Sequence, residues 1–416
     1  MKTVAQRSDG ALRALPAARI IDAVSDAAAR WRDADFPPRV RVTAALIART
    51  AYCAPMVEYA LDRLFAALER AALRATIVDE LGSVEILDGF VPRKGRPDAF
   101  ARGVGRVCIV ASRTTIGVAL VPAVYALCAK CDVVVKDRED ELVAEFFKTL
   151  AQEDGEFLTA ATALQWNGAQ ESAEFLRDTE VLVVFGKDQT LRSLREWLAP
   201  HARFIGYGSR ASAGYVSRES LAGQTEVADL ARRASRDVIL YESEGCLSLH
   251  VMFVESGGAL SPHEFSASFA RAMEQATLDF PRGPRNDAAA ARFDAYRQLS
   301  SFRSALGNGS TFSDNRASFC VVFDPPSEQP PPFLPRTIGI HPVQTPQDAL
   351  RYLRRHAILL EGFALSAHRK DTIDLAIDAG AVRLTSFGRL QCPPRSGGHG
   401  GRPRIAEFVR LIDKEL

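Results

Sequence analysis

Short apolar runs alternate with helical stretches from Gly103 onward, and this alternation limits the possible folds more than any other feature of the sequence. Apolar strands separated by helices are typical of right-handed βαβ units, in which helices bury a parallel sheet on both faces. Sheets of this kind bind ligands outside the carboxyl ends of their strands. The sequence therefore predicts an α/β fold with Rossmann-like cores of parallel strands.

The alternation occurs in two blocks, one on each side of Cys246. In the first block we expect strands at 104–111, 132–136, 180–185 and 203–206, and helices at 118–129, 139–150 and 190–198. In the second block we expect strands at 251–254, 317–323, 337–340 and 381–386, and helices at 262–277, 287–301 and 347–356. The first hundred residues are expected to be helical, with helices at 17–33 and 43–81, and the chain is expected to end in a helix at 405–414.

Charge and hydropathy exclude several classes of function. Basic and acidic residues nearly cancel, at 52 and 51, so the chain lacks the charge excess of a nucleic-acid or membrane-surface binder. The polar N-terminus lacks the apolar core of a signal peptide, and no apolar run reaches the roughly 18 residues of a membrane span. Seven cysteines, an odd number without a secretion signal, indicate reduced thiols. We expect a cytoplasmic protein that acts on small molecules.

Several common active-site motifs are missing from the sequence. Cys128 and Cys131 form a CxxC pair, but no second ligand pair lies nearby for zinc, and the pair follows a helix instead of opening one as a redox pair does. The histidines lack the HExxH spacing, so no metal site is expected. Neither a GxSxG elbow nor the dinucleotide fingerprint GxGxxG occurs, and Gly206 and Gly208 form only an isolated GxG.

Cys246 differs from the other cysteines in its neighbours. Gly245 allows a sharp turn before it, and the following Leu-Ser-Leu-His is compatible with one helical turn whose N–H groups point at the sulfur. Such groups lower the pKa of a thiol and can hold an oxyanion. From the residues alone a nucleophile and a packed thiol both remain open, since a single cysteine is a weak motif. His250 is open in the same way, as a base or as a buried polar residue.

A set of motifs in a fixed order along nearly the whole chain carries a resemblance to a known family. They are AYCAPMVEYALDRLF (51–65), VLVVFGKDQTLRSLR (181–195), GYGSRASAGYV (206–216), EGCLSLHVMFVE (244–255), RTIGIHPV (336–343) and GAVRLTSFGRLQCPP (380–394), followed by GRP (401–403). With these motifs the sequence resembles the LuxC-like acyl-CoA reductases of bacterial luminescence operons, a branch of the aldehyde dehydrogenase superfamily. The resemblance implies that Cys246 is a nucleophile.

The resemblance also implies an aldehyde-dehydrogenase-like fold of two three-layer α/β/α domains, with the cofactor on the first and the nucleophile on the second. The expected parts are an N-terminal helical segment packing on the cofactor domain (1–100), an NAD(P)-binding domain (101–240), a catalytic domain (241–385), and an active-site loop with a return segment for oligomerisation (386–416). By analogy with the family we expect a homo-oligomer.

Residues at the expected strand ends match the cofactor-binding segments of the superfamily. Lys136 would hold the adenine-side ribose, and Gly186 with Lys187 would place a phosphate against the start of a helix. Arg138 favours the extra phosphate of NADPH, whereas Glu139 favours the free hydroxyls of NADH. We expect NADPH, with NADH as the alternative. The implied cofactor-binding residues are Ser112, Lys136, Arg138, Glu139, Gly186, Lys187 and Gly208.

The sequence departs from the superfamily pattern at three places. The asparagine that helps to bind the oxyanion is replaced by Thr114, which can donate one hydrogen bond with a shorter reach. The glutamate that activates hydrolytic water falls near Gly206, so no base stands ready to hydrolyse an acyl-enzyme. The usual WHHDGRP run is GGHGGRP at 397–403, with the aromatic residue, one histidine and the acid replaced by glycine.

The implied reaction is the reduction of an acyl thioester to an aldehyde by NAD(P)H through an acyl-Cys246 intermediate. The acyl group would come from acyl-CoA, or from an acyl-carrier or acyl-protein-synthetase partner. One alternative is an ordinary aldehyde dehydrogenase, which the absent glutamate disfavours. The other is a catalytically quiet subunit that accepts an acyl group on Cys246 for a partner, which Thr114 and the glycine-rich loop leave open.

Overall fold

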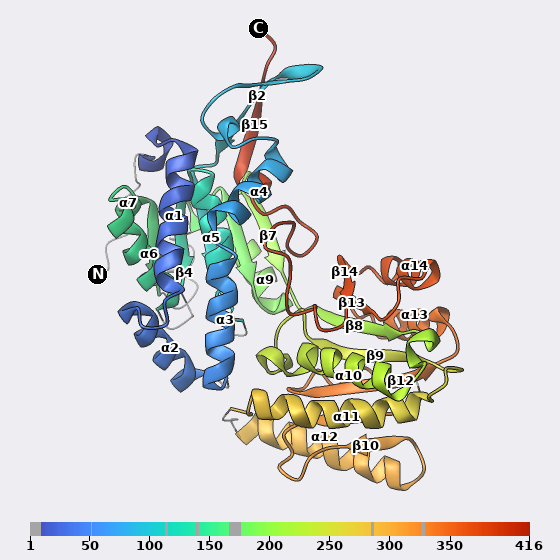
Figure 1. Cartoon of the computed structure of the whole chain (residues 1–416). Helices are drawn as coiled ribbons and strands as arrows, with labels where there is room; N and C mark the ends of the chain where they lie inside the picture. Colours follow the sequence, from blue (N-terminus) through green and yellow to red (C-terminus); the bar gives the residue numbers. More distant parts are fainter. Residues whose placement is uncertain are drawn as a thin grey trace. The chain divides into compact units, whose positions relative to one another are not determined.

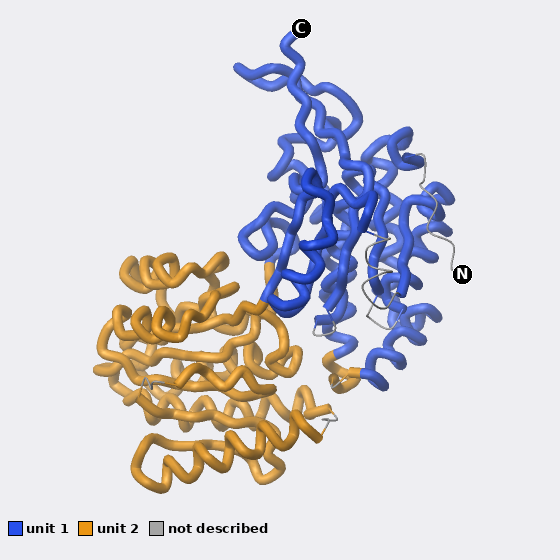
Figure 2. Tube along the Cα trace, turned by 180° about the vertical axis from the view of Figure 1, so that it is seen from behind, with its two compact units in different colours: residues 1–49, 57–208, 394–416 blue, residues 50–56, 209–393 orange. Residues whose placement is uncertain are grey.

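The computed structural model of the chain describes residues 10–50, 52–112, 115–137, 141–165, 176–283, 287–325 and 329–416. The chain forms two compact units, which Figure 2 colours separately. Unit 1 contains Met1–Arg49, Val57–Gly208 and Pro394–Leu416, and unit 2 contains Thr50–Met56 and Ser209–Pro393. Each unit is built around a sheet of its own, so each is described by itself.

The core of unit 1 is a parallel sheet (Figure 1). Its described strands, in spatial order, are β5 (Ala161–Leu164), β4 (Asp132–Lys136), β3 (Arg106–Val110), β6 (Val181–Phe185) and β7 (Arg203–Tyr207). All neighbouring strands are parallel. The chain extends the sheet from β3 toward β5 and then in the other direction from β6 toward β7. Sheets with such a reversal bind ligands at the carboxyl ends of the strands beside it, here β3 and β6.

Helices cover both faces of this sheet. The described helices are α1 (Ala17–Trp31), α2 (Pro37–Arg49), α3 (Ala54–Ala66), α4 (Arg70–Leu81), α5 (Leu120–Cys128), α6 (Leu142–Glu153), α7 (Phe157–Ala160) and α9 (Asp188–Arg195), with 3-10 turns η1 (Ala11–Ala14) and η2 (Glu85–Leu87). Cys108 and Val110 lie in one apolar cluster with Leu191 of α9. Val107 and Ile109 alternate with them and are fully buried, so they point to the other face, and α5 contacts β3 and β4.

Unit 2 contains a larger sheet whose described strands are parallel except at one edge. In spatial order they are β10 (Ser310–Phe312), β11 (Cys320–Phe323), β12 (Thr337–Val343), β9 (Leu249–Glu255), β8 (Ala211–Val216), β13 (Leu360–Leu365) and β14 (Arg383–Ser386), with β10 antiparallel to β11. The described helices are α10 (Gln224–Ile239), α11 (Pro262–Asp279), α12 (Asp287–Ala305), α13 (Pro346–Arg355) and α14 (Lys370–Asp378), with 3-10 turns η3 (Arg218–Leu221) and η4 (Leu240–Ser243).

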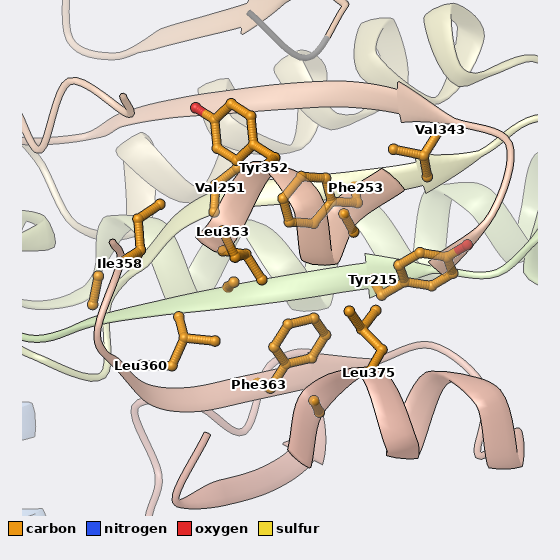
Figure 3. Packing of buried hydrophobic residues seen from close by; sticks show 14 of the residues in the cluster. Tyr215, Val251, Phe253, Val343, Tyr352, Leu353, Ile358, Leu360, Phe363 and Leu375 are labelled. Carbon is orange, nitrogen blue, oxygen red and sulfur yellow. The ribbon is translucent and has the colours of Figure 1, made fainter. Parts of the chain in front are cut away.

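Strand β9 lies near the middle of this sheet and is buried along its whole length. On one face, Phe253 of β9 and Phe363 of β13 pack with Tyr352 and Leu353 of α13 and Leu375 of α14 (Figure 3). Helices α10 and α11 pack on each other and contact β9, β11 and β12. Strand β9 is thus covered on both faces, and the turn that precedes it leads directly into this buried strand.

A small antiparallel sheet in unit 1 corrects two expectations. It consists of β1 (Val91–Arg93), β2 (Arg96–Gly103) and β15 (Val409–Lys414). The prediction of helices throughout the first hundred residues is wrong for β1 and β2, and the predicted helix at 405–414 is wrong, because a 3-10 turn η5 (Ala406–Phe408) leads into β15 instead. Each residue of β15 pairs with one of β2, from Val409 opposite Gly103 to Lys414 opposite Asp98. This partner lies far away in sequence, so the local apolar spacing could not reveal it.

The remaining predicted elements lie close to the observed ones, but their grouping differs. The stretch 43–81 is divided among α2, α3 and α4. The unit boundary falls between Gly208 and Ser209, whereas the sequence placed it after residue 240, because β8 pairs with β9 and β13 of unit 2. None of the described helices is long and apolar enough to cross a membrane.

Candidate active site

Cys246 lies in a tight turn at the amino end of β9. The Ser248 N–H donates to the Gly245 carbonyl at 3.0 Å, so Cys246 and Leu247 are the two central residues of a β-turn. The single helical turn expected from the sequence is therefore a β-turn, and β9 follows it directly. Cys246 is partly exposed.

Hydrogen bonds hold this turn against the neighbouring strand and the C-terminal part of unit 2. The Ser212 hydroxyl donates to the Cys246 carbonyl at 3.0 Å and accepts from the Gly362 N–H at 3.0 Å. The Ser212 N–H donates to the Ser248 carbonyl at 3.1 Å. The Gln391 amide donates to the Ser248 hydroxyl at 2.8 Å. The backbone around the sulfur is thus tied to two other parts of unit 2.

The surroundings of the Cys246 sulfur disfavour its charged form. Burial, together with the buried Glu361 carboxylate, raises the pKa of the Cys246 thiol to about 12. The backbone N–H groups of Cys246 and Leu247 and the Arg210 guanidinium act in the opposite direction, with a smaller effect. The N–H groups expected from the sequence are therefore present, but the net direction is the reverse of the lowered pKa that we expected, because removal from water outweighs them.

His250 is a buried residue on β9. Burial lowers the pKa of its imidazole to about 4, so the ring is neutral near pH 7. Its Nδ1 has no hydrogen-bond partner among the described residues, and the ring packs edge-on against Phe333 at 5.2 Å between centroids. Of the two interpretations left open for His250, the structure fits the buried polar residue.

The three residues that end η4 have an unusual backbone. Tyr241, Glu242 and Ser243 have φ values of 57°, 53° and 58°, in the left-handed region that costs a non-glycine residue roughly 1–2 kcal/mol. The Glu244 N–H closes the turn by donating to the Tyr241 carbonyl at 2.9 Å. This strained turn ends three residues before Cys246.

A buried ion pair fixes the strained turn. Arg336, itself at φ 48°, donates from Nε to Glu242 Oε2 at 2.8 Å and from Nη2 to Glu242 Oε1, and both side chains are almost completely buried. The Arg336 N–H donates to the Ser243 hydroxyl at 3.0 Å, and that hydroxyl donates to the Val238 carbonyl at 2.7 Å. The sequence reasoning missed this pair, because only the fold brings residues 242 and 336 together.

The expected cofactor residues that the structure describes lie at one edge of the unit 1 sheet. Ser112 follows β3, Lys136 ends β4, Lys187 follows β6 and Gly208 follows β7. The strand registers place Lys136 opposite Val110 of β3, so these residues share the carboxyl edge. Thr114, Arg138 and Glu139 lie outside the described residues.

Two glycines at this edge differ in their surroundings. A Cβ added at Gly186 would meet its nearest atom, of Thr190, at 3.5 Å, which is an ordinary contact distance. A Cβ at Gly208 would meet the Asp188 carboxylate at 2.4 Å. Gly186 therefore has ordinary contact distances around it, whereas the absence of a side chain at Gly208 allows close packing of Asp188.

Comparisons with known proteins agree with this arrangement. The sequence profile of the family described as "Acyl-CoA reductase (LuxC)" matches residues 12–411. The chain belongs to the LuxC acyl-CoA reductase family. No curated protein matches the sequence.

Solved structures with a similar fold include aldehyde dehydrogenases. An NAD-dependent benzaldehyde dehydrogenase from Corynebacterium glutamicum has a TM-score of 0.71 at 13% identity, covering 97% of this chain and 87% of its own. Aldehyde dehydrogenase 21 from Physcomitrella patens, in complex with succinate, has a TM-score of 0.74 at 12% identity, covering 97% and 86%. A glyceraldehyde-3-phosphate dehydrogenase from Methanocaldococcus jannaschii, complexed with NADP, has a TM-score of 0.72 at 12% identity, covering 97% and 91%. The expected aldehyde-dehydrogenase-like α/β fold is confirmed.

Membership of the LuxC family makes the chain an acyl-CoA reductase, an oxidoreductase that forms an aldehyde from an acyl group. Among the described residues, no group of three or more His, Cys, Asp or Glu side chains is arranged to hold a metal ion.

The glycine-rich segment at 397–403, which departs from the LuxC pattern, has a defined structure. His399 and Arg402 exchange backbone hydrogen bonds of 2.8 and 3.0 Å, and the two residues between them, Gly400 and Gly401, have φ values of 57° and 75°. This is the two-residue hairpin that needs φ > 0 at both central positions, where Asp-Gly and Gly-Gly are both favoured. Replacement of the usual aspartate by Gly400 is thus compatible with the same turn.

The hairpin places the imidazole of His399 at the carboxyl edge of the unit 1 sheet. The His399 ring packs edge-on against Tyr207, the last residue of β7, at 4.8 Å, and against Phe185, the last residue of β6, at 5.9 Å between centroids. Tyr207 and Phe185 stack at 4.7 Å. His399 therefore lies beside the strand ends that carry Lys187 and Gly208.

Proposed function

We propose that this LuxC family member reduces an acyl thioester to an aldehyde through an acyl-Cys246 intermediate, with NADPH as the reductant. The observation that carries the proposal is the position of Cys246, partly exposed in a hydrogen-bonded β-turn with two backbone N–H groups directed toward its sulfur. The described cysteines Cys108, Cys128, Cys131 and Cys320 are buried.

The first step is an exchange of thioesters. The Cys246 sulfur attacks the carbonyl carbon of the acyl donor, a new C–S bond forms, and the donor's C–S bond breaks as its thiol leaves. The proton of the Cys246 thiol ends on the departing sulfur, so no net proton is taken up. The N–H groups of Cys246 and Leu247 are positioned to stabilise negative charge in this turn, which is the requirement of an oxyanion site. Thr114, which the superfamily pattern implies as a further donor, is proposed for the same site.

Reduction then releases the product. When bound, the reduced nicotinamide supplies a hydride for the acyl carbon. The C–S bond to Cys246 breaks, the aldehyde leaves, and the sulfur takes up a proton. The chain's own contribution is to hold the acyl group on one sulfur and to keep water from cleaving it.

The structure of β7 supports the exclusion of hydrolysis. By the resemblance to the superfamily, the glutamate that activates water in aldehyde dehydrogenases falls near Gly206. A Cβ there would meet Phe204 at 2.7 Å and Leu191 at 2.8 Å, so the position has no room for a longer side chain without displacement of both neighbours. An ordinary aldehyde dehydrogenase, which hydrolyses its acyl-enzyme, therefore fits the chain less well.

Cofactor binding is assigned to the carboxyl edge of the unit 1 sheet. Lys136 would hold the adenine-side ribose, and Gly186 and Lys187 would hold a phosphate. Ser112 and Gly208, at the adjoining strand ends, would contact the cofactor there. The choice of NADPH over NADH rests on Arg138, with Glu139 as the residue that would favour NADH. The acyl donor is acyl-CoA or an acyl group on a carrier or acyl-protein-synthetase partner, and the active form is a homo-oligomer.

Intact mass spectrometry with a panel of acyl-CoA donors tests this proposal. We expect one acyl adduct on the parent protein, none on Cys246→Ser, and consumption of NADPH with aldehyde release by the parent. Cys53→Ser and Cys392→Ser are matched controls, because these two cysteines are also partly exposed, and they should acylate as the parent does. Acylation without NADPH or NADH consumption would instead identify an acyl-accepting subunit, and adducts that persist in Cys246→Ser would reject Cys246 as nucleophile.

A further inference from the structure

In unit 2, one buried glutamate paired with an arginine lies in η4, ahead of β9, and another is the last residue of β9. In η4, Glu242 pairs with Arg336, and the side chains are 3% and 0% exposed. At the carboxyl end, Glu255 pairs with Arg218 and Arg369, and here the arginine side chains are 45% and 27% exposed while the glutamate is 1% exposed. Only the first pair is removed from water on both sides.

The Glu242–Arg336 pair is poorly suited to a role in stability alone. Arg336 Nη1 is buried with no hydrogen-bond partner among the described residues, so the guanidinium is left partly unsatisfied. Buried ion pairs generally contribute little net stability because both charges lose water, and an unsatisfied donor adds to that loss. Both residues also have left-handed backbones, at φ 53° and 48°. Such strain persists where the surrounding structure imposes it, and it is concentrated at functional sites.

What the pair does hold in place is the path of the chain toward Cys246. Glu242 is the middle residue of the left-handed turn. The Arg336 side chain donates to the Glu242 carboxylate, and the Arg336 backbone N–H donates to the Ser243 hydroxyl. Residues 50–56, which belong to unit 2, add a third contact, because the Tyr241 N–H donates to the Met56 sulfur at 3.1 Å. Only Glu244 and Gly245 separate this turn from Cys246.

We infer that the Glu242–Arg336 ion pair is a positioning device for Cys246: it fixes the left-handed turn and thereby the place of the sulfur relative to the N–H groups of its β-turn. Neither residue is assigned a contact with the acyl group. The inference rests on the proposed role of Cys246 as the acyl acceptor. This role could not be predicted from the sequence, because residues 242 and 336 lie far apart along the chain.

Glu242→Gln tests the inference, with Glu255→Gln as its matched control. Both changes replace a buried carboxylate by an amide of the same shape and weaken its pairing with arginine, Glu242 in η4 before β9 and Glu255 at the carboxyl end of β9. The readouts are the thermal midpoint, the first-order rate constant of Cys246 acylation at saturating acyl-CoA, the acyl-CoA concentration at half-saturation, and the rate of Cys246 alkylation by iodoacetamide.

A positioning role predicts a split between these readouts. In Glu242→Gln the acylation rate constant should fall on the order of 10²-fold, as expected for a misplaced reacting group, while half-saturation changes little. In Glu255→Gln the thermal midpoint should fall while the acylation rate constant stays near that of the parent. Equal acylation by folded Glu242→Gln and the parent, or an equal loss in Glu255→Gln, would overturn the inference.

Two further measurements keep the test decisive. If Glu242→Gln does not fold, Ser243→Ala replaces it, since this change removes only the hydroxyl that joins the turn to Arg336 and Val238, and the same fall in acylation rate is expected. If the parent protein is not acylated, the proposed function fails, but positioning is still judged by alkylation. A changed alkylation rate constant in Glu242→Gln, with no change in Glu255→Gln, would support the positioning of Cys246 by the Glu242–Arg336 pair. An unchanged rate constant in Glu242→Gln would reject it.

Discussion

At position 246, burial and hydrogen bonding act on the ionisation of one sulfur in opposite directions. Burial and the Glu361 carboxylate raise the pKa of the thiol to about 12, against the N–H groups of the turn and Arg210. The sequence singled out Cys246 as a candidate nucleophile, through the resemblance to the family. It could not predict the electrostatic surroundings of the sulfur, because Glu361 is on β13 and Arg210 immediately precedes β8, and only the sheet order brings them beside the turn.

The pH dependence of Cys246 alkylation tests this balance. Because the thiolate is the reactive form and the pKa lies far above neutrality, the rate of iodoacetamide alkylation should rise about tenfold per pH unit between roughly pH 7 and 9. Removing the nearby negative charge by Glu361→Gln should lower the pKa and give a severalfold higher rate at each pH. Alkylation is followed by intact mass in a Cys53→Ser, Cys392→Ser background.

Arg210→Gln provides the opposite change for comparison. Loss of the guanidinium removes a charge that favours the thiolate, so the rate at each pH should fall below that of the parent. A parent rate that is flat between pH 7 and 9 would contradict this account, since it would mean that the thiolate is already formed there.

At the scale of elements, local sequence patterns correctly predicted the helices and strands that are determined by their own apolar spacing. The apolar runs of β4 and β6 and the amphipathic helices α1 and α11 were predicted within a few residues, because each buries its own face. Strand β15 was predicted as a helix because its pairing with β2 is non-local. The hairpin at 399–402 lies between these cases: its glycines suggested a loop, but the packing of His399 depends on the ends of β6 and β7.

The hairpin is expected to support cofactor binding at the carboxyl edge of the unit 1 sheet. Gly401 has φ 75°, a conformation that a β-branched residue avoids, so Gly401→Val should open the hairpin and release His399 from Tyr207 and Phe185. We expect severalfold weaker NADPH binding, measured by the fluorescence of the bound nucleotide, with acylation of Cys246 unchanged.

Gly400→Asn is the matched control for the hairpin. Asparagine tolerates φ 57°, and Asn-Gly is among the most favourable pairs for a two-residue turn, so NADPH binding should remain close to that of the parent. Equal weakening by both variants would show that the loss of glycine itself, and not the opening of the turn, is responsible.

At the scale of the whole molecule, chain order does not determine which residues belong together. Residues 50–56 belong to unit 2 and residues 394–416 to unit 1, so each unit contains segments that the other interrupts. The two blocks of strand–helix alternation indicated more than one unit, and the resemblance indicated their kind. The boundary after residue 208 could not be read from the sequence, because β8 follows β7 without an intervening helix and yet pairs in the second sheet.

This division predicts how the cofactor changes thermal stability. The residues assigned to cofactor binding lie in unit 1, whereas Cys246 lies in unit 2. A ligand at about 100 times its Kd stabilises the state that binds it by about 2.7 kcal/mol. For a unit of this size that corresponds to a rise in Tm of about 5–10 °C.

In calorimetry, NADPH should therefore raise the Tm of the unit 1 transition, and acylation of Cys246 should change the Tm of the unit 2 transition. If NADPH moved only the transition that also responds to acylation, the assignment of the cofactor to the unit 1 sheet edge would be wrong; a single transition that responds to both would mean that the two units unfold as one.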